Sequence, residues 1–332
     1  MDKIKAVNLG GWLVLERWMN EELFARNHVK GNDETCFVTQ VEDFQSQLEE
    51  HWDTYITNDD LDWIKAQGIN VVRIPFPWWI YGENEYARSI EKLDQILLYL
   101  QEIDLDFMLD LHTAPGCQNG FDNGGIQNVL EWPNDQKNID KTIEVLVNIS
   151  KRYKENKNFH SIQLLNEPNI SIDLNIIQDF YLEAYKQIRQ VLTDNYIVMH
   201  DGFRLDVWEE FFTTNSFHNV ILDTHMYQCF DQREHKFTIE QHEKAALSRA
   251  KRLKKVSALV PVIVGEWSLG MRPNEHIGKD LPENMKRYAD AQLKAMHDCA
   301  GHVFWSYKVR HTHHGWHFRR LVEEGIIDLK EY

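Results

Sequence analysis

Eight short apolar runs recur along the chain, separated by longer amphipathic stretches. Within each run the apolar residues are nearly continuous and do not alternate with polar ones, a pattern typical of parallel strands covered on both faces. The runs therefore predict eight strands, at residues 6–13, 71–76, 107–112, 162–167, 197–200, 220–225, 262–266 and 303–307.

Several stretches between these runs have the period of amphipathic helices. In residues 90–102 the apolar side chains fall at steps of three and four, at Ile90, Leu93, Ile96, Leu97 and Leu100. Residues 179–192 predict a second helix, residues 31–50 a helical insertion after the first strand, and residues 274–285 a loop after the seventh. Strands and helices that alternate in this way predict parallel strands joined by right-handed crossovers.

The closed form of that pattern is the (β/α)8 TIM barrel, an α/β fold with its active site at the C-terminal ends of the strands. We expect a single catalytic barrel domain over residues 1–332, because no Pro/Gly-rich linker or charge run divides the chain. The alternative is an open doubly wound sheet, which usually carries a glycine-rich phosphate turn after its first strand. Residues 8–12, Asn-Leu-Gly-Gly-Trp, lack the GxGxxG spacing of that turn.

The net charge and composition of the chain exclude some classes of binding partner. The formal net charge is −16, which repels nucleic acid and anionic membrane surfaces, so we expect neither as a partner. No window approaches a membrane span, and residues 1–5 lack the features of a signal peptide. The cysteines have no CxxC spacing, so we expect reduced thiols and a cytoplasmic protein; they are Cys36, Cys117, Cys229 and Cys299.

Polar residues capable of chemistry stand at or near the ends of the predicted strands, where a TIM barrel builds its active site. Two of them, Glu167 and Glu266, each close an apolar run. Any one of these residues alone could be a satisfied core group or a surface partner. Their coincidence at one mouth favours a functional set, which comprises Arg73, His112, Asn166, Glu167, His225, Tyr227, Glu266 and Trp305.

Two carboxylates that face each other across a barrel mouth suit glycoside hydrolysis. One protonates the leaving oxygen, and the other attacks the sugar carbon or activates water. Arg73 and Tyr227 near Glu266 would keep that carboxylate ionised, as a nucleophile requires. Glu167 is then the acid, and we expect partial burial and the charge of Glu266 to raise its pKa. Asn166 would reach the 2-hydroxyl of the sugar.

The same residues carry a resemblance to a known family. It rests on residues 7–16 (VNLGGWLVLE), 51–52 (HW), 68–75 (GINVVRIP) and above all 110–123 (DLHTAPGCQNGFDN). Over residues 6 to about 327 the chain resembles glycoside hydrolase family 5 of clan A, whose members are retaining (β/α)8 enzymes. Within that family it is most similar to the exo-β-1,3-glucanase group.

The resemblance implies roles for individual residues. The eight recurrent active-site residues of the family match the eight named above, with Glu167 as acid/base and Glu266 as nucleophile. By the same resemblance Glu16 and Asp122 bind hydroxyls of the sugar in the −1 subsite, and Trp305 forms its stacking floor. Asn123, next to Asp122, is grouped with them as a binding or supporting residue.

The chain departs from the exo-glucanase group in loops that shape the leaving-group side. Glu16 is followed by Arg17 and Trp18, where the group usually has Pro and then Tyr or Phe. Residues 76–79 read Phe-Pro-Trp-Trp in place of Ile-Gly-Tyr-Trp. The resemblance therefore specifies the chemistry more closely than the linkage or the aglycone.

Tryptophan is abundant, and six of the 11 residues fall at or just after predicted strand ends. Aromatic faces stack on pyranose rings but are also common core material, so we expect about half of these six to be packing residues. Trp305, followed by Trp78 or Trp79, is the expected ligand contact. The other three are Trp12, Trp18 and Trp267.

Two further clusters have simple interpretations. Histidines 311, 313, 314 and 317 lie beside Arg310, Arg319 and Arg320, which would repel a cation, so we expect no metal and no cofactor. One hypothesis is that the basic stretch 310–320 contacts an anionic aglycone. Cys117 and Cys229 stand near site residues without an ordered Cys-His-Asn arrangement, which favours buried thiols over a nucleophile.

Together these observations predict a metal-independent, retaining, exo-acting β-glycosidase of the cytoplasm. We expect its substrates to be short β-glucans, other oligosaccharides or β-glucosides, cleaved by double displacement in the manner of a β-1,3-glucosidase. A β-mannosidase or a β-1,4- or β-1,6-glucosidase remains open, because the preferred 2-hydroxyl configuration depends on side chains that the sequence does not place. A non-catalytic sugar-binding barrel is the other alternative, although it would not need a tuned acid and nucleophile together.

Overall fold

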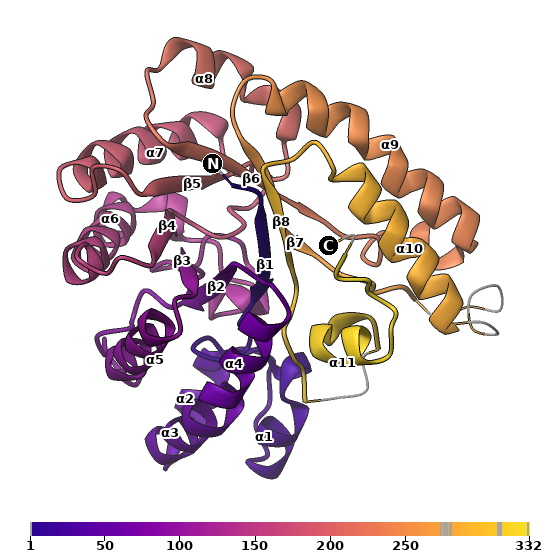
Figure 1. The fold of residues 1–332 in the computed structure, drawn as a ribbon. Helices are drawn as coiled ribbons and strands as arrows, with labels where there is room; N and C mark the ends of the chain where they lie inside the picture. Colours follow the sequence, from indigo (N-terminus) through magenta and orange to yellow (C-terminus); the bar gives the residue numbers. More distant parts are fainter. Residues whose placement is uncertain (1, 273, 275–277, 279–280, 311–313, 331) are drawn as a thin grey trace.

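The computed structural model describes residues 2–272, 274, 278, 281–310, 314–330 and 332. Within them, eight parallel strands pair in chain order and close into a barrel, with β8 paired to β1 (Figure 1). The predicted (β/α)8 barrel is thereby confirmed. The strands are β1 Ile4–Asn8, β2 Val71–Phe76, β3 Asp106–Leu111, β4 Phe159–Gln163, β5 Tyr196–His200, β6 Val220–Met226, β7 Val262–Trp267 and β8 Gly301–Phe304.

Helices surround the barrel and cover its outer face (Figure 1). The predicted helix at 90–102 is present with those bounds, because its apolar stripe packs into the core between barrel and helices. No helix in the described part of the chain combines the length and apolarity needed to cross a membrane. The helices are α1 Glu21–Arg26, α2 Glu34–Gln40, α3 Phe44–Tyr55, α4 Asn58–Ala66, α5 Ile90–Glu102, α6 Gln136–Tyr153, α7 Leu174–Arg189, α8 Glu209–Thr214, α9 Ile239–Ser257, α10 Leu281–Ala295 and α11 Phe318–Glu323.

Four strands end earlier than the sequence predicts: β3 by one residue, β8 by three, and β1 and β4 by four or more. β1 stops at Asn8 because two glycines turn the chain: Gly11 has φ +69°, and a Cβ on Gly10 would lie 2.7 Å from the ring of Trp305. β4 stops at Gln163, so residues 164–167 form a loop rather than the end of a strand. The predicted insertion at 31–50 is helical, as α2 and most of α3. The predicted loop at 274–285 lies partly outside the described residues, and α10 begins within it.

The barrel interior is filled in layers, because residues two apart on a strand point to the same side. A lower layer is apolar and fully packed, with contributions from Ala6, Val71, Met108, Val198, Ile221, Ile263 and Val303. Two residues further along, the inward positions of most strands are polar and buried, at Asn8, Arg73, Asp110, Gln163, His200 and Asp223. The apolar layer closes the bottom of the barrel, and the polar layer forms the floor of the mouth.

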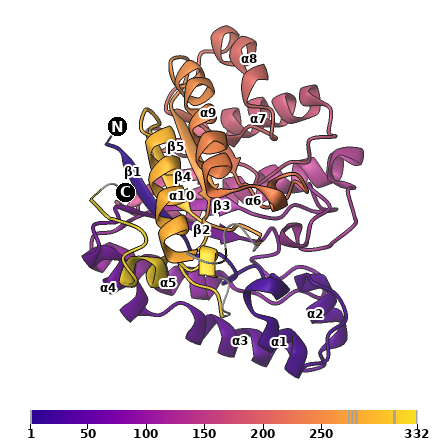
Figure 2. The same cartoon turned by 90° about the vertical axis from the view of Figure 1, so that its right-hand side faces the viewer.

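The insertion after β1 forms one wall of that mouth. Figure 2 shows α1 and α2 on the side of the molecule away from the two termini. Glu16 and Asp33 pair as an antiparallel bridge, and the Thr35 amide donates to the Gly125 carbonyl at 3.1 Å. The insertion is therefore tied to the loops that follow β1 and β3.

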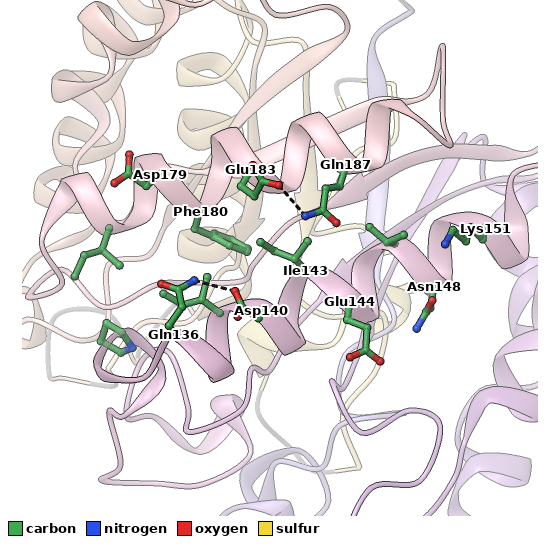
Figure 3. A pocket seen from close by; sticks show the side chains of 14 residues that line it. Gln136, Asp140, Ile143, Glu144, Asn148, Lys151, Asp179, Phe180, Glu183 and Gln187 are labelled. Atoms are coloured by element: carbon green, nitrogen blue, oxygen red, sulfur yellow. Dashed lines mark hydrogen bonds between the residues drawn. The ribbon is translucent and has the colours of Figure 1, made fainter.

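A cleft of about 740 Å³ lies elsewhere, between α6 and α7 on the outer helical layer (Figure 3). Its floor includes Ile143 and Phe180, and its rim carries Asp140 and Glu183. None of the residues that line it is among the predicted site residues, which meet instead at the mouth of the barrel.

Candidate active site

Arg73 on β2 is the centre of the polar layer. Its guanidinium is fully buried, where a cation is tolerated only if it is paired and hydrogen-bonded. Its partners come from five segments of the chain and saturate it: Asn8 Oδ1 (2.7 Å), Gln163 Oε1 (3.0 Å), Asn166 Oδ1 (2.8 Å), Glu266 Oε1 (3.1 Å) and Asp110 Oδ2 (3.2 Å). Arg73 thus joins predicted residues of the loop after β4 and of β7 into one cluster.

Glu266 is turned into the barrel by an irregularity in β7. The register between β6 and β7 shifts after Thr224, so that His225 pairs with Glu266 and Gly265 is the extra residue. Such bulges often re-aim a side chain beside an active site. A Cβ on Gly265 would lie 2.3 Å from the carboxylate of Asp223, so the bulge requires glycine at this position.

The predicted contacts of Glu266 are present. Arg73 Nη1 donates to its Oε1 at 3.1 Å, and Tyr227 Oη donates to its Oε2 at 2.8 Å. Burial raises the pKa of Glu266 and the charge of Glu167 adds to this, whereas the positive charges of His225 and Arg73 oppose it. The two hydrogen bonds fix the carboxylate and leave it facing the other glutamate.

Glu167 lies in the loop after β4, in a left-handed backbone conformation with φ +45°. Non-glycine residues rarely adopt this region, and where they do the surroundings must hold them. Here both oxygens are held: Oε1 accepts from His225 Nδ1 and Oε2 from Asn123 Nδ2, each at 2.8 Å. Asn123 is itself fixed by Asn119 at 2.8 Å, so its position supports the acid.

The pKa of Glu167 differs from the sequence-based expectation. Burial raises it, as expected, but the hydrogen bond and charge of His225 outweigh burial and lower the pKa to about 2. The pKa of His225 is raised well above its ordinary value, because the charges of Glu266 and Asp223 outweigh its burial. The two shifts have opposite directions and a shared cause, the contact of His225 Nδ1 with Glu167 Oε1 at 2.8 Å, so the two groups titrate as a hydrogen-bonded pair.

Five buried side-chain atoms of this cluster have no hydrogen-bond partner among the described residues, namely Asp110 Oδ1, His200 Nε2 and three atoms on predicted site residues: Glu16 Oε1, His112 Nε2 and Asn166 Nδ2. The last three side chains are those expected to contact a sugar. Each of these three is anchored by its other polar atom, which bonds to Trp18, Asp110 or Arg73, respectively. Buried polar groups are nearly always paired, so such exceptions in one place need a reason. Hydroxyl groups of a bound ligand would satisfy the three atoms on the predicted site residues.

Glu16 and Asp122 form a second acidic pair beside these atoms. Burial, followed by the charge of Asp122, raises the pKa of Glu16 well above its ordinary value. Burial also raises the pKa of Asp122. Carboxyl groups in this state can both accept hydrogen bonds from hydroxyls and, when protonated, donate to them.

Of the six tryptophans near strand ends, Trp18 and Trp78 are partly exposed and the other four are buried, Trp305 among them at 3% exposure. Trp12, Trp79 and Trp267 are at most 1% exposed and pack internally. Trp79 stacks on Tyr86 with ring centroids 4.0 Å apart, which leaves it only a supporting role behind Trp78. Trp305 is stacked on His112 at 5.4 Å, and its peptide bond to Ser306 is cis.

Several residues of the site were not among those predicted. Asp110 accepts from His112 Nδ1 at 2.6 Å, and Asp223 accepts from His225 Nε2 at 3.1 Å, so each carboxylate fixes one site histidine. Gln163 donates to Asp223 at 2.8 Å and thereby links it to Arg73. Their signal in the sequence is a charged or amide side chain within an otherwise apolar strand.

Three side chains of the site lie close enough together to bind a metal ion. Glu167, His225 and Glu266 offer ligand atoms within 4.8 Å of one another, a spacing that could hold a metal ion. Both nitrogens of His225 are already bonded to carboxylates and Arg73 bonds Glu266, whereas a metal needs a neutral imidazole. The arrangement suits acid–base chemistry better than metal binding.

Two of the three arginines in the stretch 310–320 pair with acids, as does Lys308 just before it, whereas Arg310 donates to Thr54 Oγ1 at 3.3 Å. Lys308 bonds Asp60 at 2.6 Å, and Arg319 and Arg320 pair with Glu323 and Glu324 one turn further along α11. Histidines 311 and 313, part of the predicted basic loop, lie outside the described residues. The pairing leaves Lys308, Arg319 and Arg320 little charge for an anionic aglycone.

The cysteines are free thiols. Cys117 and Cys229 are buried, and burial raises the pKa of both, to about 12 for Cys229. A thiol with a raised pKa is a poor nucleophile. These side chains therefore act as small buried packing groups beside the site.

Comparison with known proteins assigns this chain to a family. Residues 32–310 match the model described as Cellulase (glycosyl hydrolase family 5). A protein of Emericella nidulans named "Probable glucan 1,3-beta-glucosidase A" is 31% identical over 98% of this chain and 90% of its own length. The "Glucan 1,3-beta-glucosidase" of Candida oleophila is also 31% identical, over 98% of this chain and 88% of its own.

Solved structures share the fold at lower identity. The rutinosidase from Aspergillus niger superposes with a TM-score of 0.86 at 19% identity and covers 99% of this chain and 98% of its own. The endoglucanase Cel5A from Thermotoga maritima superposes with a TM-score of 0.63 at 15% identity, over 99% of this chain and 95% of its own.

Proposed function

The chain belongs to glycosyl hydrolase family 5 and is a glycoside hydrolase, and from that premise we propose that it is a retaining, exo-acting β-glucosidase. Its proposed substrates are short β-1,3-linked glucans and β-glucosides. The observation that carries the proposal is the ring of unpartnered buried atoms on Glu16, His112 and Asn166 around the two glutamates. Hydroxyl recognition beside a carboxylate pair is what cleavage of a glycosidic bond requires.

The spacing of the two carboxylates supports double displacement. One oxygen of Glu167 and one of Glu266 lie within 4.8 Å of each other. In inverting enzymes the carboxyl groups stand about 6.5–9.5 Å apart to leave room for a water molecule between them and the sugar, whereas in retaining enzymes they are about 5–5.5 Å apart. The short spacing favours direct attack by one carboxylate.

In the first step, Glu266 attacks the anomeric carbon as the bond to the leaving oxygen breaks. The proton that Glu167 passes to that oxygen comes from the His225 imidazolium, 2.8 Å from Glu167 Oε1, which becomes neutral. Arg73 and Tyr227 hold Glu266 in line during the attack and release its oxygens as the ester forms. The products are the leaving alcohol and a glycosyl ester on Glu266.

In the second step, water attacks the anomeric carbon from the side that the leaving group vacated. Glu167 accepts a proton from this water and His225 takes it up, while the bond between the sugar and Glu266 breaks. The free sugar leaves with the same anomeric configuration that the substrate had, and both enzyme groups return to their starting protonation.

The specificity for β-1,3-glucosides rests on the names of the relatives and on the surroundings of the mouth. Phe121 and Phe230 are 44% and 72% exposed, high values for large apolar side chains. Phe121 precedes Asp122 in sequence, and Phe230 packs edge-on against Tyr227 with centroids 5.4 Å apart. We assign these rings to the leaving-group side, where a second sugar or an apolar aglycone would stack.

We also propose that the enzyme works in the cytoplasm. The four cysteines are free and three of them are buried, which suits a reducing compartment. Small glycosides rather than polymers would then be its substrates. Cell fractionation tests this location independently of the activity.

The function is tested by a screen of aryl β-glycosides and β-linked glucose disaccharides, with the product anomer followed by NMR. We expect hydrolysis of aryl β-glucoside and of the β-1,3 disaccharide, with β-glucose released first. A preference for mannosides would move the assignment to the alternative β-mannosidase. Binding of these sugars without any turnover would support the sugar-binding barrel instead.

A further inference from the structure

We propose that Glu34, in the inserted helix α2, is a positioning residue for the sugar-binding side of the pocket. It holds the loop after β1, which carries Glu16, against the loop after β2, which carries Trp78 and Trp79. The inference rests on the proposed function, because it concerns how the pocket for the terminal sugar is kept in shape.

Glu34 bridges the two loops with its two carboxylate oxygens. Oε2 accepts from the backbone amide of Leu15 at 2.8 Å, and Oε1 accepts from Trp79 Nε1 at 3.1 Å. The side chain is 1% exposed, so no water competes for these bonds. Leu15 immediately precedes Glu16, so the first bond fixes the backbone from which that side chain projects.

The neighbours of Glu34 in the first turn of α2 bind a third loop. Asp33 accepts from the Gln127 amide at 2.9 Å, and Thr35 donates to the Gly125 carbonyl from its hydroxyl at 2.6 Å. Both partners follow Asp122 and Asn123 in the loop after β3. One turn of helix therefore meets the three loops that supply Glu16, Trp78 and Asp122.

Stability alone is a weak reason to keep a carboxylate here. Burial raises the pKa of Glu34 to about 7, and only the bonds from Leu15 and Trp79 offset it. Among the described residues no cation forms an ion pair with it, and burying such a group without one is costly. What the carboxyl supplies is two acceptors set apart on one side chain, which neither glutamine nor the shorter aspartate reproduces at this span.

The position of Glu16 depends on that anchor at one end and on Trp18 at the other. Trp18 Nε1 donates to Glu16 Oε2 at 2.8 Å, and Oε1 has no hydrogen-bond partner among the described residues. If Leu15 shifts, Oε1 moves away from the sugar although every residue of the site is still present. The expected consequence is a loss of transition-state binding rather than of the chemistry itself.

The experiment compares Glu34→Gln, Glu16→Gln and the double variant for kcat/KM on an aryl β-glucoside. In Glu34→Gln an amide NH₂ faces one of the two donors, and we expect kcat/KM to fall about tenfold, the scale of one unsatisfied buried hydrogen bond. Because Glu34 acts through Glu16, the double variant should have a kcat/KM less than about threefold below that of Glu16→Gln alone. Full multiplication of the two losses would overturn the inference, as would an unchanged kcat/KM in Glu34→Gln.

Two controls keep the test decisive. Asp94→Asn removes a carboxylate that accepts from Arg152 and Tyr153 on the outer helices, and it should lower Tm without changing kcat/KM. If Glu34→Gln does not fold, Trp79→Phe removes the indole donor together with part of the ring volume, and the loss of kcat/KM that it causes should likewise shrink in the Glu16→Gln background; an undiminished loss overturns the inference. Failure of the proposed function has a different signature, namely an inactive wild-type enzyme or active variants of Glu167 and Glu266.

Discussion

His225 donates a hydrogen bond from Nδ1 to Glu167 Oε1 across 2.8 Å, and its Nε2 donates to Asp223 at 3.1 Å. The histidine is enclosed by carboxylates, and in the proposed mechanism it supplies the proton that the acid delivers. The working acid of this site is accordingly a pair of side chains, and this has a consequence for the pH dependence of the reaction.

His225→Gln should move the alkaline limb of kcat/KM to lower pH. In the wild-type protein the pair loses its proton at the raised pKa of His225, above the ordinary 6.5, so activity falls only at higher pH. Glutamine keeps an NH donor but carries no proton to deliver, so the alkaline limb of kcat/KM in this variant gives the pKa of Glu167 alone. His302→Gln, which alters a buried histidine of β8 that packs against Tyr332, is the control. An alkaline limb at the same pH in His225→Gln and wild type would refute the paired acid.

Glu266→Ala should abolish turnover of activated aryl β-glucosides, with kcat reduced on the order of 10⁴-fold or more, as for other removed nucleophiles. Azide fits the space that the side chain leaves and attacks from the same face, so it should restore activity and give the α-glucosyl azide. Product anomers are read by NMR. A β-azide from this variant would show that Glu266 is the acid/base and Glu167 the nucleophile.

Glu167→Ala should keep the first step for substrates with good leaving groups, which need no proton. Substrates with poor leaving groups should lose about 10²–10⁴-fold in kcat/KM, the usual contribution of general acid catalysis. Azide should here yield the β-glucosyl azide, because it attacks the glycosyl ester from the opposite face. Equal losses for good and poor leaving groups would contradict the acid role.

Much of this arrangement follows from the sequence because it depends on local pattern and on the geometry of parallel strands. Buried apolar runs define the strands, and strand ends that meet at one mouth bring Arg73, Tyr227 and Glu266 together. Asp110 and Asp223 are visible in the same way, as charges inside apolar runs.

Other features depend on contacts between distant segments. The register shift that aims Glu266 arises from the packing of Gly265 on Asp223. The pKa of Glu167 is lowered rather than raised because His225 lies within hydrogen-bond distance. Glu34 reaches Leu15 only after the insertion folds back on the mouth. Neither hydrophobic period nor motif spacing encodes these distances.

Gly265→Ala should damage both stability and catalysis. A Cβ at this position would come within 2.3 Å of the Asp223 carboxylate, so backbone or carboxylate must shift, at a cost of about 1–3 kcal/mol. Because Glu266 is the next residue, kcat should fall more than in other variants of equal Tm. Gly278→Ala, where no heavy atom of the described residues lies within 4 Å of the added Cβ, is the matched control. A Gly265→Ala protein with wild-type Tm and kcat would show that the bulge does not aim the nucleophile.

The central claim is that Glu266 forms a covalent bond to the sugar while the Glu167–His225 pair moves the proton. The most direct measurement is trapping with a 2-deoxy-2-fluoro-β-glucoside that has an activated leaving group, followed by mass spectrometry of the intact protein and of its peptides. The account predicts one sugar per chain, attached to the peptide that contains Glu266, together with time-dependent loss of activity. A protein that turns over β-glucosides yet forms no adduct, or forms it on the peptide that contains Glu167, would contradict it.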